Sequence, residues 1–335
     1  MIYHLTRPAQ GGMLKVLERV LETYAQDGHS QELWIHPASR EVVSCAKGLG
    51  VNVRDWPLTD KLSLLDPVAF FSQRRLGDGL VFYHGFKSFL VANPRENPVI
   101  LSLYNAVFPP WGTKGLRQAA LHQAKSRVRN LLKVVVASHS QQREASCVFD
   151  NVMVIPSGVD TELFKPGQKE QIIGFLGRLR KEKGVDLLLH AAELFPDWKF
   201  ELAGPDLDGY GKRVLPKNVQ LLGVVQNPEK VICRWSIMVL PSYTEAMPLS
   251  VLEGLSCGLC VIGSDTGDVG HLLEGGQVGL AFPVGDREKF IEALRLATSD
   301  HALREEYGRR GREKAQEFDW SRVLDMWRRL LDEWR

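Results

Sequence analysis

The sequence predicts an α/β protein that consists of two doubly wound, Rossmann-like domains. Its 335 residues are too many for one ordinary core and suit two domains of about 150 residues each. Short apolar runs of strand type alternate with segments of helical spacing along almost the whole chain, and they form two successive sets. Such alternation indicates parallel sheets that are covered by helices on both faces.

The first set predicts an N-terminal domain over residues 1–165. Its predicted strands are 2–5, 32–36, 51–53, 80–83, 99–103, 134–137 and 152–155. Segments with apolar residues at helical spacing separate most of these strands. One example carries Leu14, Leu17, Leu21 and Tyr24.

The second set predicts a C-terminal domain over residues 166–318. Its predicted strands are 172–176, 200–203, 219–222, 237–240, 260–263 and 279–282. The polar Pro/Gly break at 164–169 marks the predicted boundary between the domains. Residues 319–335 place Val323, Leu324, Trp327, Leu330, Leu331 and Trp334 at helical spacing. We expect this amphipathic final helix to pack back on the N-terminal domain.

The composition excludes several classes of protein. Hydrophobic residues make up 44% and charged residues 24%, which is ordinary globular usage. The formal net charge of +2 is too small to indicate nucleic acid binding. Five scattered cysteines, no apolar run of about 20 residues and no secretory signal predict a soluble, cytoplasmic protein with reduced thiols.

Gly11 and Gly12 form the first motif, between the first strand and the helix that starts near Met13. Paired glycines let backbone N–H groups approach an oxyanion, and a helix N-terminus favours negative charge. An ordinary strand-to-helix turn explains the pair equally well, because the G-x-G-x-x-G fingerprint is absent.

A second motif follows the predicted strand 237–240. Its polar loop leads to Pro248, at the expected first position of a helix. The free N–H groups around this start suit a diphosphate; they belong to Met247, Leu249 and Ser250. Glu245 and Glu253 flank the start, and their carboxylates suit hydroxyls of a ribose and a sugar. Taken singly, each glutamate is more simply a solvated charge.

The third motif, 177–184, follows the first strand of the second domain and opens a helix. Its Arg178 and Lys183 can neutralise a diphosphate, the arginine as a fork and the lysine as a point charge. A basic surface loop is the alternative interpretation.

Together these segments resemble the retaining glycosyltransferases of the GT-B fold, the large family 4 group. The resemblance is dense from about 134 to 295. It is carried by Ile155-Pro156-Ser157-Gly158-Val159-Asp160 with Phe164, by Phe175-Leu176-Gly177-Arg178 with Lys183-Gly184-Val185-Asp186-Leu187-Leu188, by Leu240-Pro241-Ser242 with Glu245-x7-Glu253, and by Cys257-Gly258-Leu259 with Ser264-Asp265-Thr266-Gly267.

The resemblance implies an acceptor-side first domain and a donor-binding second domain. Arg178 and Lys183 would hold the donor diphosphate, Glu253 the ribose hydroxyls and Glu245 the transferred sugar, with Arg178, Lys183 and Glu245 as the catalytic set. The other implied donor contacts are Gly11, Gly12, Gly177, Ala246, Met247, Pro248 and Leu249, and the acceptor-side candidates are His84, Tyr104 and Ser138. For His84, a turn histidine with satisfied hydrogen bonds is an equally good interpretation.

Three departures from the family pattern leave the transferred sugar open. Ala246 stands where the family usually has glycine, and Tyr104 where it often has histidine. Gly270-His271 replaces the common Pro-Glu.

The implied reaction is retaining transfer of a hexosyl or N-acetylhexosaminyl unit from a nucleotide sugar, with UDP-sugar favoured. The acceptor would be a hydroxyl of a glycan or glycolipid, in cell-envelope polysaccharide synthesis. No cofactor and no metal are expected. A nucleotide-sugar epimerase and a non-catalytic nucleotide-sugar-binding partner subunit are the alternatives.

Three further patterns have simpler interpretations. Cys257 and Cys260 have redox spacing, but the first ends a predicted helix and the second begins a strand, so we expect plain buried thiols. Asp206-Leu207-Asp208 reads as a turn. The basic stretch 108–133 has one apolar face and suits peripheral contact with the inner face of the cytoplasmic membrane, although packing on its own sheet explains it at least as well.

Overall fold

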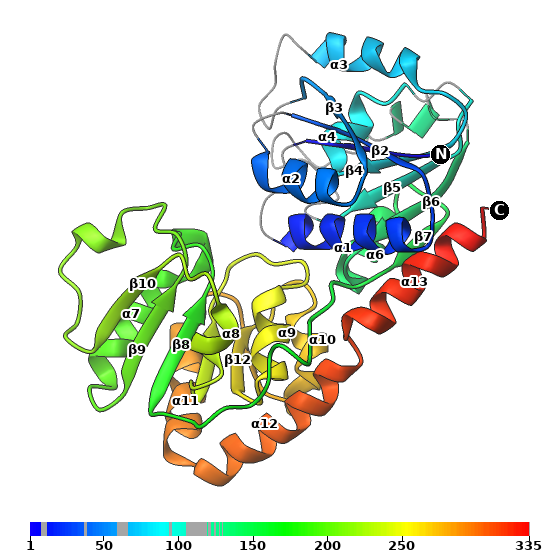
Figure 1. Cartoon of the computed structure of the whole chain (residues 1–335). Helices are drawn as coiled ribbons and strands as arrows, with labels where there is room; N and C mark the ends of the chain where they lie inside the picture. Colours follow the sequence, from blue (N-terminus) through cyan, green and yellow to red (C-terminus); the bar gives the residue numbers. More distant parts are fainter. Residues whose placement is uncertain are drawn as a thin grey trace. The chain divides into compact units, whose positions relative to one another are not determined.

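The computed structural model describes residues 1–7, 12–36, 39–58, 66–93, 96–104, 119, 122–123, 125–126, 128 and 130–334. The chain divides into two compact units (Figure 1). Unit 1 comprises Met1–Pro156 and Val323–Arg335, and unit 2 comprises Ser157–Arg322. The borders between the units therefore follow residues 156 and 322, whereas the sequence predicts them after 165 and 318.

Within the described residues, unit 1 contains a seven-stranded parallel sheet of order β3-β2-β1-β4-β5-β6-β7. Its strands are β1 (Ile2–Thr6), β2 (Gln31–Ile35), β3 (Asn52–Asp55), β4 (Leu80–His84), β5 (Val99–Leu103), β6 (Leu131–Val136) and β7 (Val152–Val154). The chain reverses its direction of winding between β1 and β4, which is the topological switch point of such a sheet.

Burial on both faces explains the composition of the central strands of unit 1. Every residue of β1, β4 and β5 is buried, as expected for a parallel sheet between two helical layers. Among the described residues before β8, the helices are α1 (Gly12–Gln26), α2 (Arg40–Gly48), α3 (Asp66–Ser72), α4 (Phe86–Leu90) and α6 (His139–Ala145), with a 3₁₀ turn at Gln73–Arg75.

The last helix, α13 (Trp320–Asp332), buries one face in unit 1. Trp327 is fully buried, and its carbonyl oxygen accepts a hydrogen bond of 3.1 Å from the Tyr24 hydroxyl. Next to Trp327 in the sequence, Arg328 lies 2.9 Å from the carboxylate of Asp27. The end of the chain thus completes the core formed by its beginning.

Unit 2 repeats the doubly wound plan with a six-stranded parallel sheet of order β10-β9-β8-β11-β12-β13. Its strands are β8 (Ile172–Leu176), β9 (Lys199–Ala203), β10 (Val219–Gly223), β11 (Ile237–Leu240), β12 (Cys260–Ser264) and β13 (Leu280–Phe282). Its helices are α7 (Val185–Leu194), α8 (Pro228–Ile232), α9 (Leu249–Ser256), α10 (Val269–Leu272), α11 (Arg287–Ser299) and α12 (His301–Gln316), with 3₁₀ turns at Lys181–Lys183, Tyr210–Lys212 and Glu274–Gly276. The predicted α/β class with two doubly wound parallel sheets is confirmed.

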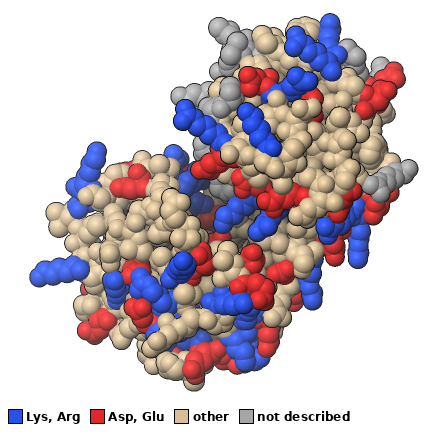
Figure 2. All heavy atoms as spheres, in the orientation of Figure 1, with Lys and Arg blue, Asp and Glu red and all other residues tan. Residues whose placement is uncertain are grey.

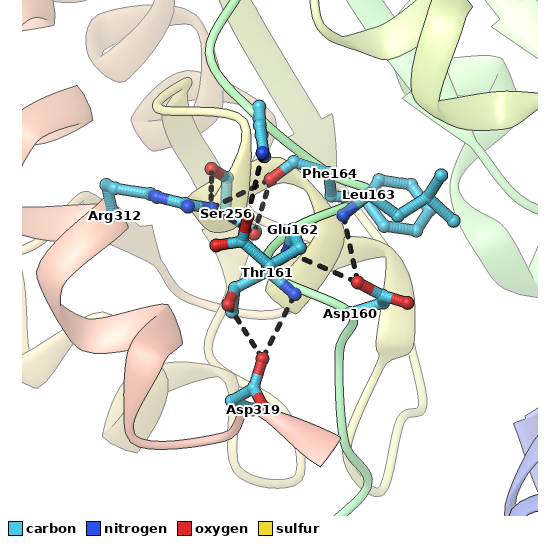
Figure 3. A network of polar contacts seen from close by, with 9 residues as sticks. Asp160, Thr161, Glu162, Leu163, Phe164, Ser256, Arg312 and Asp319 are labelled. Atoms are coloured by element: carbon cyan, nitrogen blue, oxygen red, sulfur yellow. Dashed lines mark hydrogen bonds and ion pairs between the residues drawn. The ribbon is translucent and has the colours of Figure 1, made fainter. Parts of the chain in front are cut away.

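The two segments of unit 2 next to its borders are joined to each other (Figure 3). Val159 and Asp319 form a parallel bridge, and the Asp319 carboxylate accepts hydrogen bonds from the amide and the hydroxyl of Thr161, at 3.2 and 2.7 Å. Arg312 and Ser256 donate to the carbonyl oxygen of Phe164 at 2.8 and 2.7 Å. We call Val159–Phe164 together with Asp319 the joint.

Candidate active site

The candidate site lies in unit 2, where two loops leave the sheet at its switch point. The loop 177–184 follows β8 and the loop 241–248 follows β11, and these strands are neighbours. The amide of Tyr243 donates a hydrogen bond of 2.9 Å to the carbonyl oxygen of Glu182, which joins the loops directly. In open parallel sheets this is the position where ligands bind.

Lys183 and Glu245 meet where these two loops come together, a place that we call the crevice. The Lys183 ammonium lies 2.6 Å from Oε1 of Glu245, and the two side chains are only 15% and 12% exposed. The structure thus brings together residues of two separate motifs, one predicted as a cation for phosphate and one as a hydroxyl acceptor. An ion pair that is this well shielded is screened little by salt.

Arg178 remains at the solvent-facing edge of the same loop. One of its terminal nitrogens lies 3.5 Å from the Glu182 carboxylate, and both side chains are about half exposed. Such an exposed pair contributes little to stability, so the guanidinium can exchange this partner for an anionic ligand.

Two glycines, not selected from the sequence as site residues, set the shape of the crevice. Gly184 has φ of 71°, and a Cβ atom there would lie 2.1 Å from the carbonyl oxygen of Pro241. Gly267 has φ of 60°, and its Cβ atom would lie 2.5 Å from the carbonyl oxygens of Glu245 and Ala246. Both positions exclude a side chain by backbone conformation and by space. The signals in the sequence are a glycine directly before a predicted helix, at Gly184, and a glycine shortly after a predicted strand, at Gly267.

Helix α9 begins beside this crevice. Pro248, predicted as the first helical residue, is instead the N-cap, because its ψ of 119° is extended; Leu249 is the first residue of the helix. The helix start has no side-chain cap, so it presents the positive end of the helix dipole. Glu253, one turn into α9, is 4% exposed.

Gly177 and Met247 complete the described donor candidates. The amide of Gly177 donates 2.9 Å to the carbonyl oxygen of Ala203, and a side chain on the neighbouring Gly204 (φ 137°) would strike the Gly177 carbonyl oxygen at 1.9 Å. This fixes the exit of β8. Met247 is 9% exposed in the loop before α9.

The candidates of unit 1 serve the fold in this structure. The Tyr104 hydroxyl donates 2.5 Å to the carbonyl oxygen of Ile155, and Ser138 caps α6 by accepting 3.1 Å from the amide of Gln141. Gly12 is the first residue of α1, whereas Gly11 lies outside the described residues. The acceptor-side roles of Tyr104 and Ser138 stay predictions.

His84, the last residue of β4, is buried and lies 3.1 Å from His4, measured from Nε2 of His84 to Nδ1 of His4. Burial, and then the neighbouring His4, hold the pKa of His84 well below its ordinary value. Its imidazole is therefore neutral at physiological pH.

The simpler interpretations of Asp206-Leu207-Asp208 and of the two cysteines are confirmed. Asp206 accepts hydrogen bonds from the amides of Gly209, Tyr210 and Gly211, so Asp206-Leu207-Asp208 is a turn. Cys257 ends α9 and Cys260 begins β12. Burial raises the pKa of both thiols to about 12, which makes them unreactive. No cluster of three or more His, Cys, Asp or Glu side chains suited to a metal occurs among the described residues.

Most of the basic stretch 108–133 lies outside the described residues. Two of its described lysines pair with acids: Lys125 lies 2.7 Å from Asp150, and Lys133 lies 3.1 Å from Glu333. On the face drawn in Figure 2, basic and acidic side chains are interspersed. Among the described helices, none has both the length and the apolar character that crossing a bilayer requires.

Residues 160–314 match the family model described as glycosyl transferases group 1. Sulfoquinovosyl transferase of Arabidopsis thaliana is 28% identical over 187 residues, which are 49% of this chain and 36% of the relative. Alpha-maltose-1-phosphate synthase of Mycolicibacterium smegmatis is 28% identical over 213 residues, which are 52% of this chain and 55% of the relative. The chain spans about half or less of the length of these two relatives.

Solved structures show the same fold over the whole chain. Anabaena HepE in complex with UDP superposes with a TM-score of 0.83 and covers 99% of both chains at 17% sequence identity. HepE in complex with UDP-glucose gives a TM-score of 0.80. The chain therefore has the GT-B fold.

Proposed function

We propose that this chain, a GT-B protein whose residues 160–314 match the glycosyl transferases group 1, is a retaining glycosyltransferase. It moves a hexosyl or N-acetylhexosaminyl unit from a nucleotide sugar to a hydroxyl of a glycan or glycolipid. The observation that carries the proposal is the shielded pair of Lys183 and Glu245 beside the uncapped start of α9. It offers a cation, a hydroxyl acceptor and an anion-binding helix end within one crevice.

When the donor binds, Lys183 and Glu245 separate, and each contacts a different group of the ligand. The Lys183 ammonium turns from Glu245 to the diphosphate, and Arg178 leaves its weak surface partner for the same anion. The released Glu245 carboxylate accepts hydrogen bonds from hydroxyls of the sugar. Glu253 receives the ribose hydroxyls, and the backbone from Ala246 to Leu249 meets the phosphates.

In the reaction, the bond between the anomeric carbon and the diphosphate oxygen breaks, and its electron pair leaves with the nucleoside diphosphate. The acceptor hydroxyl oxygen forms the new bond on the same face, and its proton passes to the departing phosphate oxygen. Lys183 and Arg178 stabilise the charge that develops on the leaving group. We propose no metal in this role, because the two cations supply the charge.

The nucleotide in this proposal is UDP, supported by the solved complexes of HepE with UDP and UDP-glucose. For the acceptor we propose an envelope glycan or glycolipid, and for the location the cytoplasm. The acceptor and the location follow from the resemblance of the motifs to the family 4 glycosyltransferases.

A thermal-shift panel with UDP, GDP, ADP and their common sugars tests donor binding, because a ligand that binds only the native state raises its melting temperature. We expect UDP ligands to raise the melting temperature of the wild type and of a Lys289→Ala control, an exposed lysine on α11. Lys183→Ala should lose most of the shift. NMR of the donor with and without a panel of glycan acceptors then separates transfer from epimerisation. An equal shift in Lys183→Ala, or donor turnover without any acceptor, contradicts the proposal.

A further inference from the structure

Three buried polar side chains form a hydrogen-bonded row across the centre of the sheet in unit 1. Gln31 on β2, His4 on β1 and His84 on β4 are 6%, 0% and 4% exposed. Nε2 of His4 lies 3.1 Å from Oε1 of Gln31, and Nδ1 of His4 lies 3.1 Å from Nε2 of His84. This row of side chains ends with His84 at the carboxyl end of β4, beside the switch point between β1 and β4.

The hydrogen bonds determine which nitrogen of each ring carries its proton. The Gln31 side-chain amide donates 3.0 Å to the carbonyl oxygen of Leu21, so its other end, Oε1, faces His4 and can only accept. Nε2 of His4 must therefore carry a proton. Burial lowers the pKa of His4 to about 4, so the ring is neutral and its Nδ1 is an acceptor.

The tautomer of His84 follows from that of His4. Because Nδ1 of His4 accepts, Nε2 of His84 must donate, and the neutral His84 ring then has its lone pair on Nδ1. Within the part of the chain that the structure describes, no residue forms a hydrogen bond with that Nδ1. The ring of His4 packs against that of Phe82 with centroids 5.2 Å apart and planes inclined by 18°. The rings of His4 and His84 lie nearly parallel, at 5.4 Å and 19°, as an edge-to-edge hydrogen bond between ring nitrogens requires.

We infer that Gln31 and His4 are positioning residues that hold His84 in the tautomer whose Nδ1 accepts a hydrogen bond from a hydroxyl of the sugar acceptor. The inference rests on the proposed function for the identity of the ligand, but not for the tautomer. A neutral imidazole that presents a lone pair selects hydroxyl donors and does not attract phosphate. His84 of unit 1 would then bind a hydroxyl of the acceptor, while Lys183 and Arg178 of unit 2 bind the diphosphate of the donor.

The tautomer is tested on the whole, unmodified protein by long-range ¹H–¹⁵N NMR with ¹⁵N-labelled histidine. At pH 7.5 we expect Nε2 of both His4 and His84 to carry the proton and both Nδ1 atoms to be unprotonated. A His84 ring protonated at Nδ1 overturns the inference. This measurement needs neither a substrate nor a variant, so it holds even if the variants fail to fold.

The ligand is tested by titration with methyl α-D-glucopyranoside, followed at Nδ1 of His84. Saturable movement of that resonance is expected, and inorganic phosphate should cause none. Gln31→Leu should mix the tautomers of His84 and weaken the titration on the order of ten-fold, the effect of one hydrogen bond, while Gln220→Leu on the exposed edge strand β10 should change neither.

The outcomes separate this inference from the proposed function. An unchanged tautomer and titration in Gln31→Leu overturn the positioning role, even where UDP binding is intact. Loss of UDP binding with an intact glucoside titration instead contradicts the donor site and supports hydroxyl recognition by His84. A fixed tautomer without any glucoside response overturns the hydroxyl-binding role.

Discussion

At the scale of single residues, the contact between Lys183 and Glu245 carries the most information about chemistry. It shields two opposite charges in one crevice, so removing either partner leaves the other without its counter-charge. Under the proposed function, replacing Lys183 should therefore lower both stability and turnover, and the two effects must be measured separately.

We expect Lys183→Ala to lower turnover on the order of a hundred-fold or more, as loss of one preorganised electrostatic group does. Its free energy of unfolding should fall by roughly 1–3 kcal/mol, because Glu245 stays shielded and unpaired. Urea denaturation and kcat measured on the same preparations check both numbers. Turnover within two-fold of wild type would remove Lys183 from the mechanism.

Glu201 on β9 offers the opposite case, a buried charge with a structural role. Its Oε2 accepts 2.5 Å from Arg234 and 2.9 Å from the Trp235 indole, and Lys199 lies 2.7 Å from Oε1. Burial alone would raise the pKa of Glu201, but these hydrogen bonds, that of Arg234 first, lower it. The ion pairs and hydrogen bonds thus outweigh desolvation.

Glu201→Ala should lower the free energy of unfolding by about 3 kcal/mol, because it leaves a buried indole and one terminal nitrogen of Arg234 without their acceptor. Glu170→Ala is the matched control. Glu170 pairs with the same Arg234 at 3.2 Å but is 55% exposed, so its loss should cost less than about 1 kcal/mol. Equal costs in chemical denaturation would show that burial does not set the energy of this cluster.

At the scale of elements, the turn into α7 depends on the left-handed conformation of Gly184. Gly184→Ala adds backbone strain and drives a methyl group against the carbonyl oxygen of Pro241. We expect a loss of roughly 2–4 kcal/mol together with weaker nucleotide binding. Gly28→Ala has a similar φ of 79° and open space around it, so it should cost only about 1 kcal/mol. Isothermal titration with UDP and urea denaturation distinguish the two, and similar losses in both variants would refute the close-approach argument.

The joint gives a pH-dependent prediction (Figure 3). Burial would raise the pKa of Asp319, but hydrogen bonds from Ser321 and Thr161 lower it to about 2 from an ordinary 3.8. A depressed carboxyl pKa stabilises the fold above pH 3.8, and this contribution is lost as the pH falls from 3.8 to 2.

Asp319→Asn should therefore destabilise unit 2 at neutral pH by about 1 kcal/mol, after allowing for solvent screening of a partly exposed group. The difference from wild type should shrink between pH 3.8 and 2. Melting curves over this range check it, with Asp325→Asn, an exposed residue of α13, as control. A difference that stays constant with pH would contradict the role of the carboxylate.

The existence of the elements could be predicted from the sequence better than their ends or their contacts. The run at 134–137 was predicted as a strand, but β6 begins at Leu131, since pairing with β5 extends it beyond its most apolar part. Pro248 was placed one position too far into α9. The contact of Lys183 with Glu245 depends on how two loops meet in space, which no local pattern contains. The partner of His84 was missed for the same reason.

At the scale of the whole molecule, the order of the chain makes unit 1 discontinuous. Unit 2 is one segment, Ser157–Arg322, whereas unit 1 needs both Met1–Pro156 and Val323–Arg335. The last segment contributes four buried apolar side chains, Val323, Trp327, Leu330 and Leu331. Unit 1 therefore cannot complete its core until the last residues of the chain are present, whereas unit 2 can.

Truncation after Arg322 should accordingly loosen unit 1 and spare unit 2. Trp327 is fully buried and stacks on Tyr104 at 6.1 Å and 22°, so Trp327→Ala alone should cost about 3–5 kcal/mol. Hydrogen exchange followed by mass spectrometry checks both variants. Peptides from β1, β4 and α1 should exchange faster, whereas peptides from β8, β11 and β12 should keep wild-type protection. Proteins open in separate cooperative units, so loss of core side chains in one unit does not have to speed exchange in the other. The same comparison made on Leu296→Ala, a partly exposed side chain of α11, should leave unit 1 unchanged. Uniform loss of protection across both units would mean that they fold as one cooperative body.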